Sequence, residues 1–168
     1  MLFRSAITVI GPDRTGIVAD VAEALAGVGA NLTDSTMTRL RGHFTMTLVC
    51  TGPTAPEVIK ALEPLTDVVT SVRQVSPEAG SENVGEPYVV SVHGADRLGI
   101  VAAVTRVVAA GGGNITDLST RLSGALYVLI AEVDLPPGAG DELAEQLAVA
   151  ASELGVEVTL RRAESEIL

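Results

Sequence analysis

The sequence is poor in several residue types, and each shortage argues against a class of function. Aromatic residues make up 2% of the 168 residues and tryptophan is absent, so there are few rings on which nucleic-acid bases would stack. Lys and Arg number 11 against 21 Asp and Glu, a formal net charge of −10. A surface that neutralises phosphates needs clustered basic residues. We therefore expect no direct contact with nucleic acid.

Cysteine and long apolar segments are scarce as well. Cys50 is the only cysteine, which excludes an intrachain disulfide and a cysteine-rich metal site. The two histidines, His43 and His93, have no partner ligands at metal spacing. The N-terminal apolar run is too short for a signal peptide, and the most apolar window, 98–113, is interrupted by Arg106 and by glycines. We expect a cytoplasmic protein with no membrane span, no metal and no organic cofactor.

What the sequence does contain is an internal repeat. The stretch GPDRTG at 11–16 returns 83 positions later as GADRLG at 94–99, and 14 of the 28 positions in 7–34 match those in 90–117. The matches include Asn31 with Asn114. A period near 80 is too long for a solenoid unit, so we interpret the chain as two duplicated domains. Domains of this size bury a limited fraction of their surface, which favours a dimer or a fused pair.

Both repeats have the same order of predicted elements. A run rich in Ile, Val and Thr precedes the repeated loop, a helix follows it, and two strands joined by a short turn come next, Arg41-Gly42 in the first repeat. A second helix, opened in the first repeat by the capping box 54–57, and a last strand complete the unit. The order β-α-β-β-α-β is ferredoxin-like. We predict an α+β protein with two four-stranded antiparallel sheets, each with two helices on one face.

Hydrophobic patterning gives the expected boundaries. We expect domain 1 at 1–76, a linker at 77–87, domain 2 at 88–163 and a tail at 164–168. The strand that opens at Asn31 alternates poorly, which indicates a bulge. Asp13 or Thr15 is expected to cap the first helix. The apolar stripes are expected to be Ile17, Val18, Val21, Leu25 and Val28 on the first helix, Val58, Ile59, Leu62 and Leu65 on the second, and Leu143, Leu147 and Leu154 on the last.

The repeated loop is the candidate site. It brings backbone N–H groups and a helix N-terminus to one point, which suits a carboxylate. Asn31, at the mouth of the second strand, offers both a donor and an acceptor. Together they predict a pocket for an α-amino acid. The alternative is structural: Gly11 and Gly16 serve tight turns, Asp13 caps the helix and Asn31 takes a left-handed backbone position.

The segments GPDRTGIVADVAEALA and GANLTD, with their second copies, resemble the loop-helix-strand signature of ACT domains, small modules that most often sense amino acids. When the following segments 35–40 and 44–46 are included, the chain is similar to the tandem-ACT group of glycine cleavage system transcriptional repressors. The resemblance implies a non-enzymatic regulator that binds glycine or a close relative between paired ACT domains and acts through a regulator protein. The ligand-binding residues it implies are Gly11, Pro12, Asp13, Arg14, Thr15, Gly16 and Asn31, and Gly94, Asp96, Arg97, Leu98, Gly99 and Asn114.

The two copies depart from the ACT pattern in different ways. Thr15 and Leu98 stand where many ACT domains have proline, and Ala95 replaces Pro12, so we expect the two sites to differ, with one of them structural or weaker. A ligand-free pairing module is an alternative function. A hydrolase of the acylphosphatase type is another, because Arg14 and Asn31 mimic its catalytic pair. The phosphate loop of such an enzyme, however, needs a different arrangement of glycines, and its asparagine needs a position in the middle of the sheet.

Overall fold

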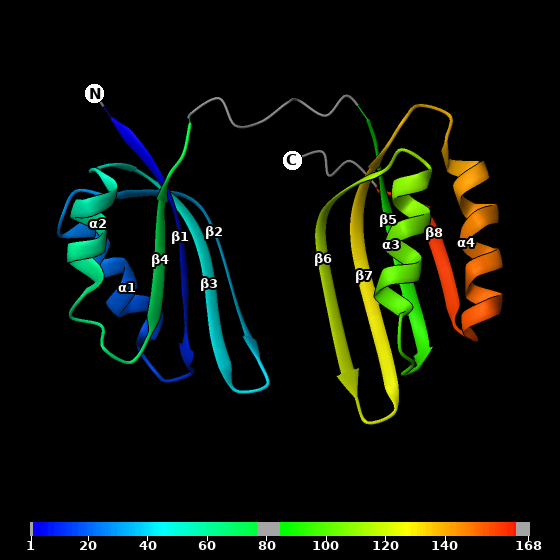
Figure 1. Cartoon of the computed structure of the whole chain (residues 1–168), viewed down its shortest axis with the longest axis horizontal. Helices are drawn as coiled ribbons and strands as arrows, with labels where there is room; N and C mark the ends of the chain where they lie inside the picture. The colour runs from blue at the N-terminus through cyan, green and yellow to red at the C-terminus, as the bar shows by residue number, and fades with distance from the viewer. Residues whose placement is uncertain (1, 77–84, 164–168) are drawn as a thin grey trace. The chain divides into compact units, whose positions relative to one another are not determined.

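The computed structural model describes residues 2–76 and 85–163. The chain divides into two compact units near residue 81, and we treat each unit by itself (Figure 1). Most of the expected linker, 77–84, and the expected tail, 164–168, lie outside the described residues.

The first unit has the predicted element order. Its elements are β1 (Phe3–Pro12), α1 (Ile17–Ala26), β2 (Asn31–Leu40), β3 (His43–Gly52), α2 (Ala55–Leu62) and β4 (Val69–Gln74). The strands form one antiparallel sheet in the order β2-β3-β1-β4, and both helices cover the same face (Figure 1). The ferredoxin-like prediction is confirmed.

The second unit repeats this architecture. Its elements are β5 (Glu86–Ala95), α3 (Ile100–Ala110), β6 (Asn114–Ser123), β7 (Leu126–Leu135), α4 (Gly140–Leu154) and β8 (Glu157–Arg162). The sheet order is β6-β7-β5-β8. β5 begins two residues before the strand expected from position 88, because Glu86 and Pro87 continue the ladder opposite Leu135 and Asp134.

Each core lies between a sheet and its two helices. In β3 the residues Phe44, Met46, Leu48 and Cys50 alternate with more exposed neighbours and pack in the core against the helices. The predicted helix stripes were too wide. Ile17, Val21 and Leu25 are buried, but Val18 on α1 is 39% exposed and Ile59 on α2 is 44% exposed. Two further residues of the predicted stripes, Val28 and Leu65, lie beyond the ends of α1 and α2. The buried residues of α1 are spaced four apart, so they form a single line along the side of the helix that contacts the sheet, and Val18 lies beside that line.

The turn predictions were right in part. Arg41 and Gly42 have φ of 51° and 81°, the left-handed pair that a two-residue hairpin requires, and the Thr54–Glu57 capping box is formed. The expected bulge is present, because the β2 register shifts between Leu32 and Asp34. β6 shifts in the same way between 115 and 117.

The expected caps of the first helix are wrong. α1 begins after Gly16, whose φ of 85° is left-handed, and no side chain of the described residues caps it; α3 begins in the same way after Gly99, with φ of 91°. Left-handed backbone at this point costs glycine little, and a side-chain cap from Asp13 or Thr15 would need the extended backbone of an ordinary N-cap.

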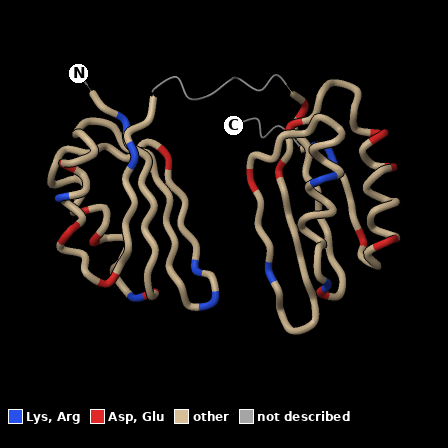
Figure 2. The backbone as a smooth tube through the Cα atoms, viewed as in Figure 1, with Lys and Arg blue, Asp and Glu red and all other residues tan. Residues whose placement is uncertain are grey.

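None of the helices in residues 2–76 and 85–163 is long and apolar enough to cross a membrane. Charged residues occur along both units, with acidic residues along α4 and basic residues at the tip of the β2–β3 hairpin (Figure 2).

Candidate functional site

Gly11 and Gly94 sit near the ends of β1 and β5, where another segment passes close to the backbone. A Cβ at Gly11 would lie 2.7 Å from the carbonyl oxygen of Asp67, and one at Gly94 would lie 2.9 Å from Cγ1 of Val156. Both approaches are tighter than a side chain tolerates. The structural interpretation of the first glycine is therefore right in substance, although the reason is a close approach within the fold and not a tight turn.

The structure does not bring the loop and the asparagine of one unit together. Gly11 pairs with Phe44 and Asn31 with Thr51, so the two contact opposite ends of β3. Seven residues of strand separate those ends by about 24 Å. The second unit is arranged alike, with Gly94 opposite Tyr127 and Asn114 opposite Asp134. A pocket that joins the loop and the asparagine within one unit is therefore a wrong prediction.

The left-handed alternative for Asn31 is wrong as well. Among the described residues, Arg41 is the one non-glycine with positive φ. The turn after α1 places its left-handed residue at Gly29, with φ of 75°, and Asn31 already belongs to β2.

Ion pairs hold the first loop. Arg14 bonds through Nε to Oδ2 of Asp67 at 2.5 Å and through Nη2 to Oδ2 of Asp20 at 2.8 Å. The hydrogen bonds to Asp67 and Asp20 raise the pKa of Arg14, and Arg14 in turn lowers the pKa of Asp67. Asp13 donates its backbone N–H to the carbonyl of Gly42 at 3.1 Å, and its carboxylate lies 3.5 Å from Nη1 of Arg39. Both charged side chains of this loop thus have oppositely charged partners on other segments.

The second loop has different partners. Arg97 donates from Nη1 to the backbone carbonyl of Glu153 at 3.0 Å. Ala103 stands where the first unit has Asp20, and Gly155 precedes Val156 where Asp67 precedes Val68, so neither acidic partner is repeated.

A cavity of about 570 Å³ opens beside this second loop. Four of its lining residues, 96–99, are predicted site residues, and the side chain of Leu98 is 98% exposed. The remaining lining residues are Ile100, Val101, Ala102 and Tyr127. The arrangement offers a guanidinium, a carboxylate and a helix N-terminus beside one hollow, which suits a small zwitterion.

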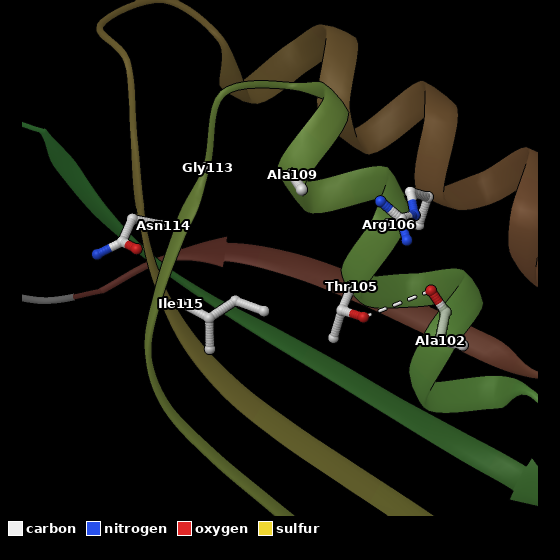
Figure 3. Close-up of a pocket in the computed structure, with 7 residues that line it drawn as sticks. All are labelled: Ala102, Thr105, Arg106, Ala109, Gly113, Asn114 and Ile115. Atoms are coloured by element: carbon white, nitrogen blue, oxygen red, sulfur yellow. Dashed lines mark hydrogen bonds between the residues drawn. The ribbon is translucent and has the colours of Figure 1, made fainter.

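Asn114 stands between two other clefts. One, of about 510 Å³, runs between α3 and the start of β6 and is lined by Ala102, Thr105, Arg106, Ala109, Gly113, Asn114 and Ile115 (Figure 3). The other, of about 200 Å³, includes Asp134 and Pro136. In Figure 3 the side chain of Ile115 points toward α3 and that of Asn114 points away from it. Thr105 bonds within its helix, donating to the carbonyl of Val101 at 2.8 Å.

Other candidate groups have ordinary surroundings. In residues 2–76 and 85–163 no three His, Cys, Asp or Glu side chains are grouped to hold a metal ion. Nε2 of His93 lies 2.7 Å from Oε2 of Glu157, and His43 bonds to the carbonyl of Leu40. Cys50 is buried in the core, and burial raises the pKa of its thiol.

Most lining residues outside the loop were missed from the sequence, and Arg106 and Tyr127 are the two with polar groups on large side chains. Comparing the repeats draws attention to Arg106, because it stands where the first unit has the oppositely charged Glu23. Tyr127 pairs with Gly94 just as Phe44 pairs with Gly11. The sequence alone assigns Tyr127 to a strand and gives no hint that it borders a cavity.

Comparison with known proteins agrees with this architecture. A UPF0237 protein of Methanocaldococcus jannaschii is 40% identical over 75 residues, 44% of this chain and 83% of that protein. UPF0237 proteins of Listeria monocytogenes are 45% identical over 47 residues, 28% of this chain. The chain spans about half, 53%, of the length of these Listeria proteins.

Two solved structures match almost the whole chain. A protein of Galdieria sulphuraria described as unknown is 30% identical, with a TM-score of 0.84, and the match covers 98% of this chain and 100% of that one. A candidate glycine cleavage system transcriptional repressor is 23% identical, with a TM-score of 0.68 over 98% and 99% of the two chains, a likeness of fold. The family model of the ACT domain matches residues 6–74 and 86–161. The chain therefore belongs to the ACT domain family and carries two ACT domains in tandem.

Proposed function

We propose that this chain is a non-enzymatic, cytoplasmic regulatory protein that senses a small amino acid, glycine or a close relative, at ACT-domain interfaces. The bound amino acid would modulate transcription or metabolism through a protein partner, as in the glycine cleavage repressors that the sequence resembles. The observation that carries the proposal is the cavity of about 570 Å³ at the second loop, with Asp96 and Arg97 on its wall.

The chemistry of that cavity fits an amino acid. The guanidinium of Arg97 and the backbone N–H groups that open α3 would receive the carboxylate, and the carboxylate of Asp96 would receive the ammonium group. The first loop is a weaker candidate, because Arg14 already binds two carboxylates, Asp67 and Asp20. A ligand there would have to displace them.

An asparagine can complete the site only from another ACT domain. Loop and asparagine lie at opposite ends of their sheet, so two domains placed side by side and turned end for end would set the loop of one against the asparagine of the other. A twofold homodimer has this geometry. The proposed ligand would then bias the protein between two quaternary arrangements in proportion to its difference in affinity for them.

The alternatives have less support. The hydrolase alternative needs a free Arg14 and a nearby asparagine, whereas Arg14 is ion-paired and Asn31 lies at the far end of the sheet. A ligand-free pairing module is compatible with the fold, and it predicts no binding of amino acids at either loop.

Titration calorimetry with a panel of amino acids, on protein refolded free of carried-over ligand, tests the proposal. We expect heat with glycine or a close relative. Arg97→Ala should weaken that binding by about tenfold or more. Arg14→Ala, the matched change at the equivalent position, should leave it within about twofold. No heat with any amino acid would favour the pairing module.

A further inference from the structure

The strand β8 forms the edge of the second sheet on the side away from β6. Among the described strands it pairs with β5 alone, so its other edge offers backbone groups that a further strand would satisfy. Ala163 donates its N–H to the carbonyl of Pro87 at 2.9 Å, one position beyond the ladder. Because hydrogen bonding alternates along an antiparallel pair, the N–H and C=O groups of Val158 and Leu160 point away from β5.

The side chains of β8 alternate between the two faces of the sheet. Val158 and Leu160 pack against the core beneath the helices. Glu157, Thr159 and Arg161 therefore lie on the face without helices, and all three are exposed. On that face β8 presents an acidic residue at its start, a small polar residue in its middle and a basic residue near its end.

Both charged side chains on this face are open to a partner. Arg161 forms no ion pair within residues 2–76 and 85–163. A cavity of about 310 Å³ beside it is lined by Val89, Arg161, Arg162 and Ala163. Glu157 bonds to His93 at 2.7 Å, yet its side chain is 79% exposed, so its carboxylate has room for a second donor.

We propose that two copies of the chain associate through β8, in an antiparallel ladder that sets Glu157 of each copy opposite Arg161 of the other. Thr159 then lies on the twofold axis. The outward backbone groups of Val158 and Leu160 exchange hydrogen bonds with those of the second copy. Because side chains from the same face meet, the helices of both copies remain on one side of the joined sheet. The contact closes with two copies, since it is twofold.

Charge selects this register among those that the backbone allows. Shifting one strand by a single residue would turn its side chains to the other face. A shift by two residues keeps the faces, but it places Glu157 opposite Thr159 or Ala163 and forms no directly opposed ion pair. In the proposed register two ion pairs form, and opposite charges directly across a ladder stabilise it.

The equivalent edge of the first unit lacks this charge pattern. β4 is also an edge strand, and its Arg73 stands at the position of Arg161. Val69, however, stands at the position of Glu157. In the same register two β4 strands would form no ion pair, β4 with β8 would form one, and two β8 strands form two. Charge thus favours association of second units with each other.

This contact goes beyond the proposed sensing function. Asn114 begins β6, at the opposite edge of the sheet, so association through β8 neither uses that asparagine nor covers it. The charges on β8 also have a competing interpretation, because charged side chains on an edge strand can serve to prevent pairing. The two interpretations predict opposite results in a cross-linking experiment.

Cysteine cross-linking of the full chain, without added amino acid, tests the proposal. Residues opposite each other in a non-hydrogen-bonded antiparallel pair have Cα atoms about 4.5 Å apart, within the range of a disulfide. Thr159→Cys should therefore form a covalent dimer under mild oxidation. Ser71→Cys, the matched change at the exposed equivalent position on β4, should form one at least about tenfold more slowly. The wild type, whose Cys50 is buried, should form none.

Charge reversals added to Thr159→Cys test the register. Glu157→Arg alone and Arg161→Glu alone should each slow dimer formation by about tenfold or more, because like charges would meet in both pairs. Both reversals in one chain set a new guanidinium at position 157 against a new carboxylate at position 161 of the second copy. This double variant should recover the original rate to within about threefold.

Two controls accompany the cross-linking rates. Reaction of each variant with a small thiol reagent corrects for changes in thiol reactivity, and circular dichroism verifies that each variant is folded. Thr159→Cys no faster than Ser71→Cys, single reversals without effect, or a double reversal as slow as the single ones would each overturn the proposal. Because no amino acid is present, these outcomes are independent of whether the protein senses one.

Discussion

Arg14 and Arg97 occupy equivalent positions in the two loops, but their guanidinium groups bind different partners. Arg14 bonds to the carboxylates of Asp67 and Asp20, whereas Arg97 donates to the backbone carbonyl of Glu153. The duplication thus preserved an arginine while one copy gained or the other lost its acidic partners. One loop is fixed by charge pairing, and the other leaves its cation beside an open cavity.

The first prediction concerns Arg14→Ala. Without the guanidinium, the pKa of Asp67, which the ion pair lowers, should rise toward its ordinary value. A carboxyl group with a lowered pKa in the folded state stabilises the fold above its unfolded pKa, and this stabilisation is lost as pH falls through the folded pKa. Arg14→Ala should therefore destabilise the protein near neutral pH and have progressively less effect in acid.

NMR titration of the carboxyl carbons and denaturant unfolding across the acid range measure both effects. Arg97→Ala is the matched control, because it removes the equivalent arginine without a carboxylate partner and should leave the pKa of Asp67 unchanged. An unaltered Asp67 titration in Arg14→Ala would contradict the ion pair.

The second prediction is that Gly11→Ala destabilises the first unit by about 1–3 kcal/mol, since the new methyl group would press on the backbone of Asp67. Gly94→Ala should act similarly in the second unit, against Val156. Gly27→Ala is the control: its φ of −62° is helical and the nearest atom to a Cβ is 3.4 Å away. Urea unfolding should find Gly27→Ala neutral or slightly stabilising, and an equal loss in all three variants would refute the close-approach argument.

The fold was predictable because it depends on local and periodic signals. The alternation in β3, the Arg41-Gly42 turn and the Thr54 capping box each follow from short-range chemistry, and the repeat supplied every element twice. The errors arose where tertiary packing or backbone conformation determines the outcome. Val18 and Ile59 are apolar at helical spacing, but how much of a helix touches a sheet is set by packing, and Val28 lies beyond the end of α1. Gly16 took the place expected of a side-chain cap because the chain turns there with left-handed backbone.

The site was less predictable, for a topological reason. Asn31 follows α1, and α1 runs back along the full length of the sheet, so the residue after the helix lies at the opposite end from the loop before it. The loop and the asparagine are close in the sequence of one repeat, which suggested that they are close in space. The β-α-β crossover places them at opposite ends of the sheet instead. Residues 96–99, which line the Arg97 cavity, were predicted as site residues. Ala103, which replaces Asp20 between the repeats, gives the sequence signal that Arg97 lacks one acidic partner of Arg14.

The third prediction concerns Ser5, which is completely buried and whose Oγ has no hydrogen-bond partner among residues 2–76 and 85–163. A buried hydroxyl without a partner has lost its hydration without compensation. Ser5→Ala should therefore leave the free energy of unfolding unchanged or raise it by about 1 kcal/mol. Thr54→Ala is the contrast, because that hydroxyl accepts from the N–H of Glu57 and its loss should cost about 1 kcal/mol. A clear destabilisation by Ser5→Ala would show that the hydroxyl is bonded.

The fourth prediction uses Cys50, which pairs with Ser5 across β1 and β3 and is 1% exposed. Burial raises the pKa of the thiol, and the thiolate is the reactive form, so a thiol reagent should reach it only when the first unit opens. With the stability of an ordinary domain, labelling in native buffer should be more than about a thousandfold slower than in denaturant. Because the chain has one cysteine, the colour released by an aromatic disulfide reagent measures this site alone.

Two glycine variants serve as controls for the labelling of Cys50. Gly11→Ala, predicted to destabilise the same unit, should label faster than wild type, whereas Gly94→Ala should not. Rapid labelling of the native wild type would place Cys50 outside the core.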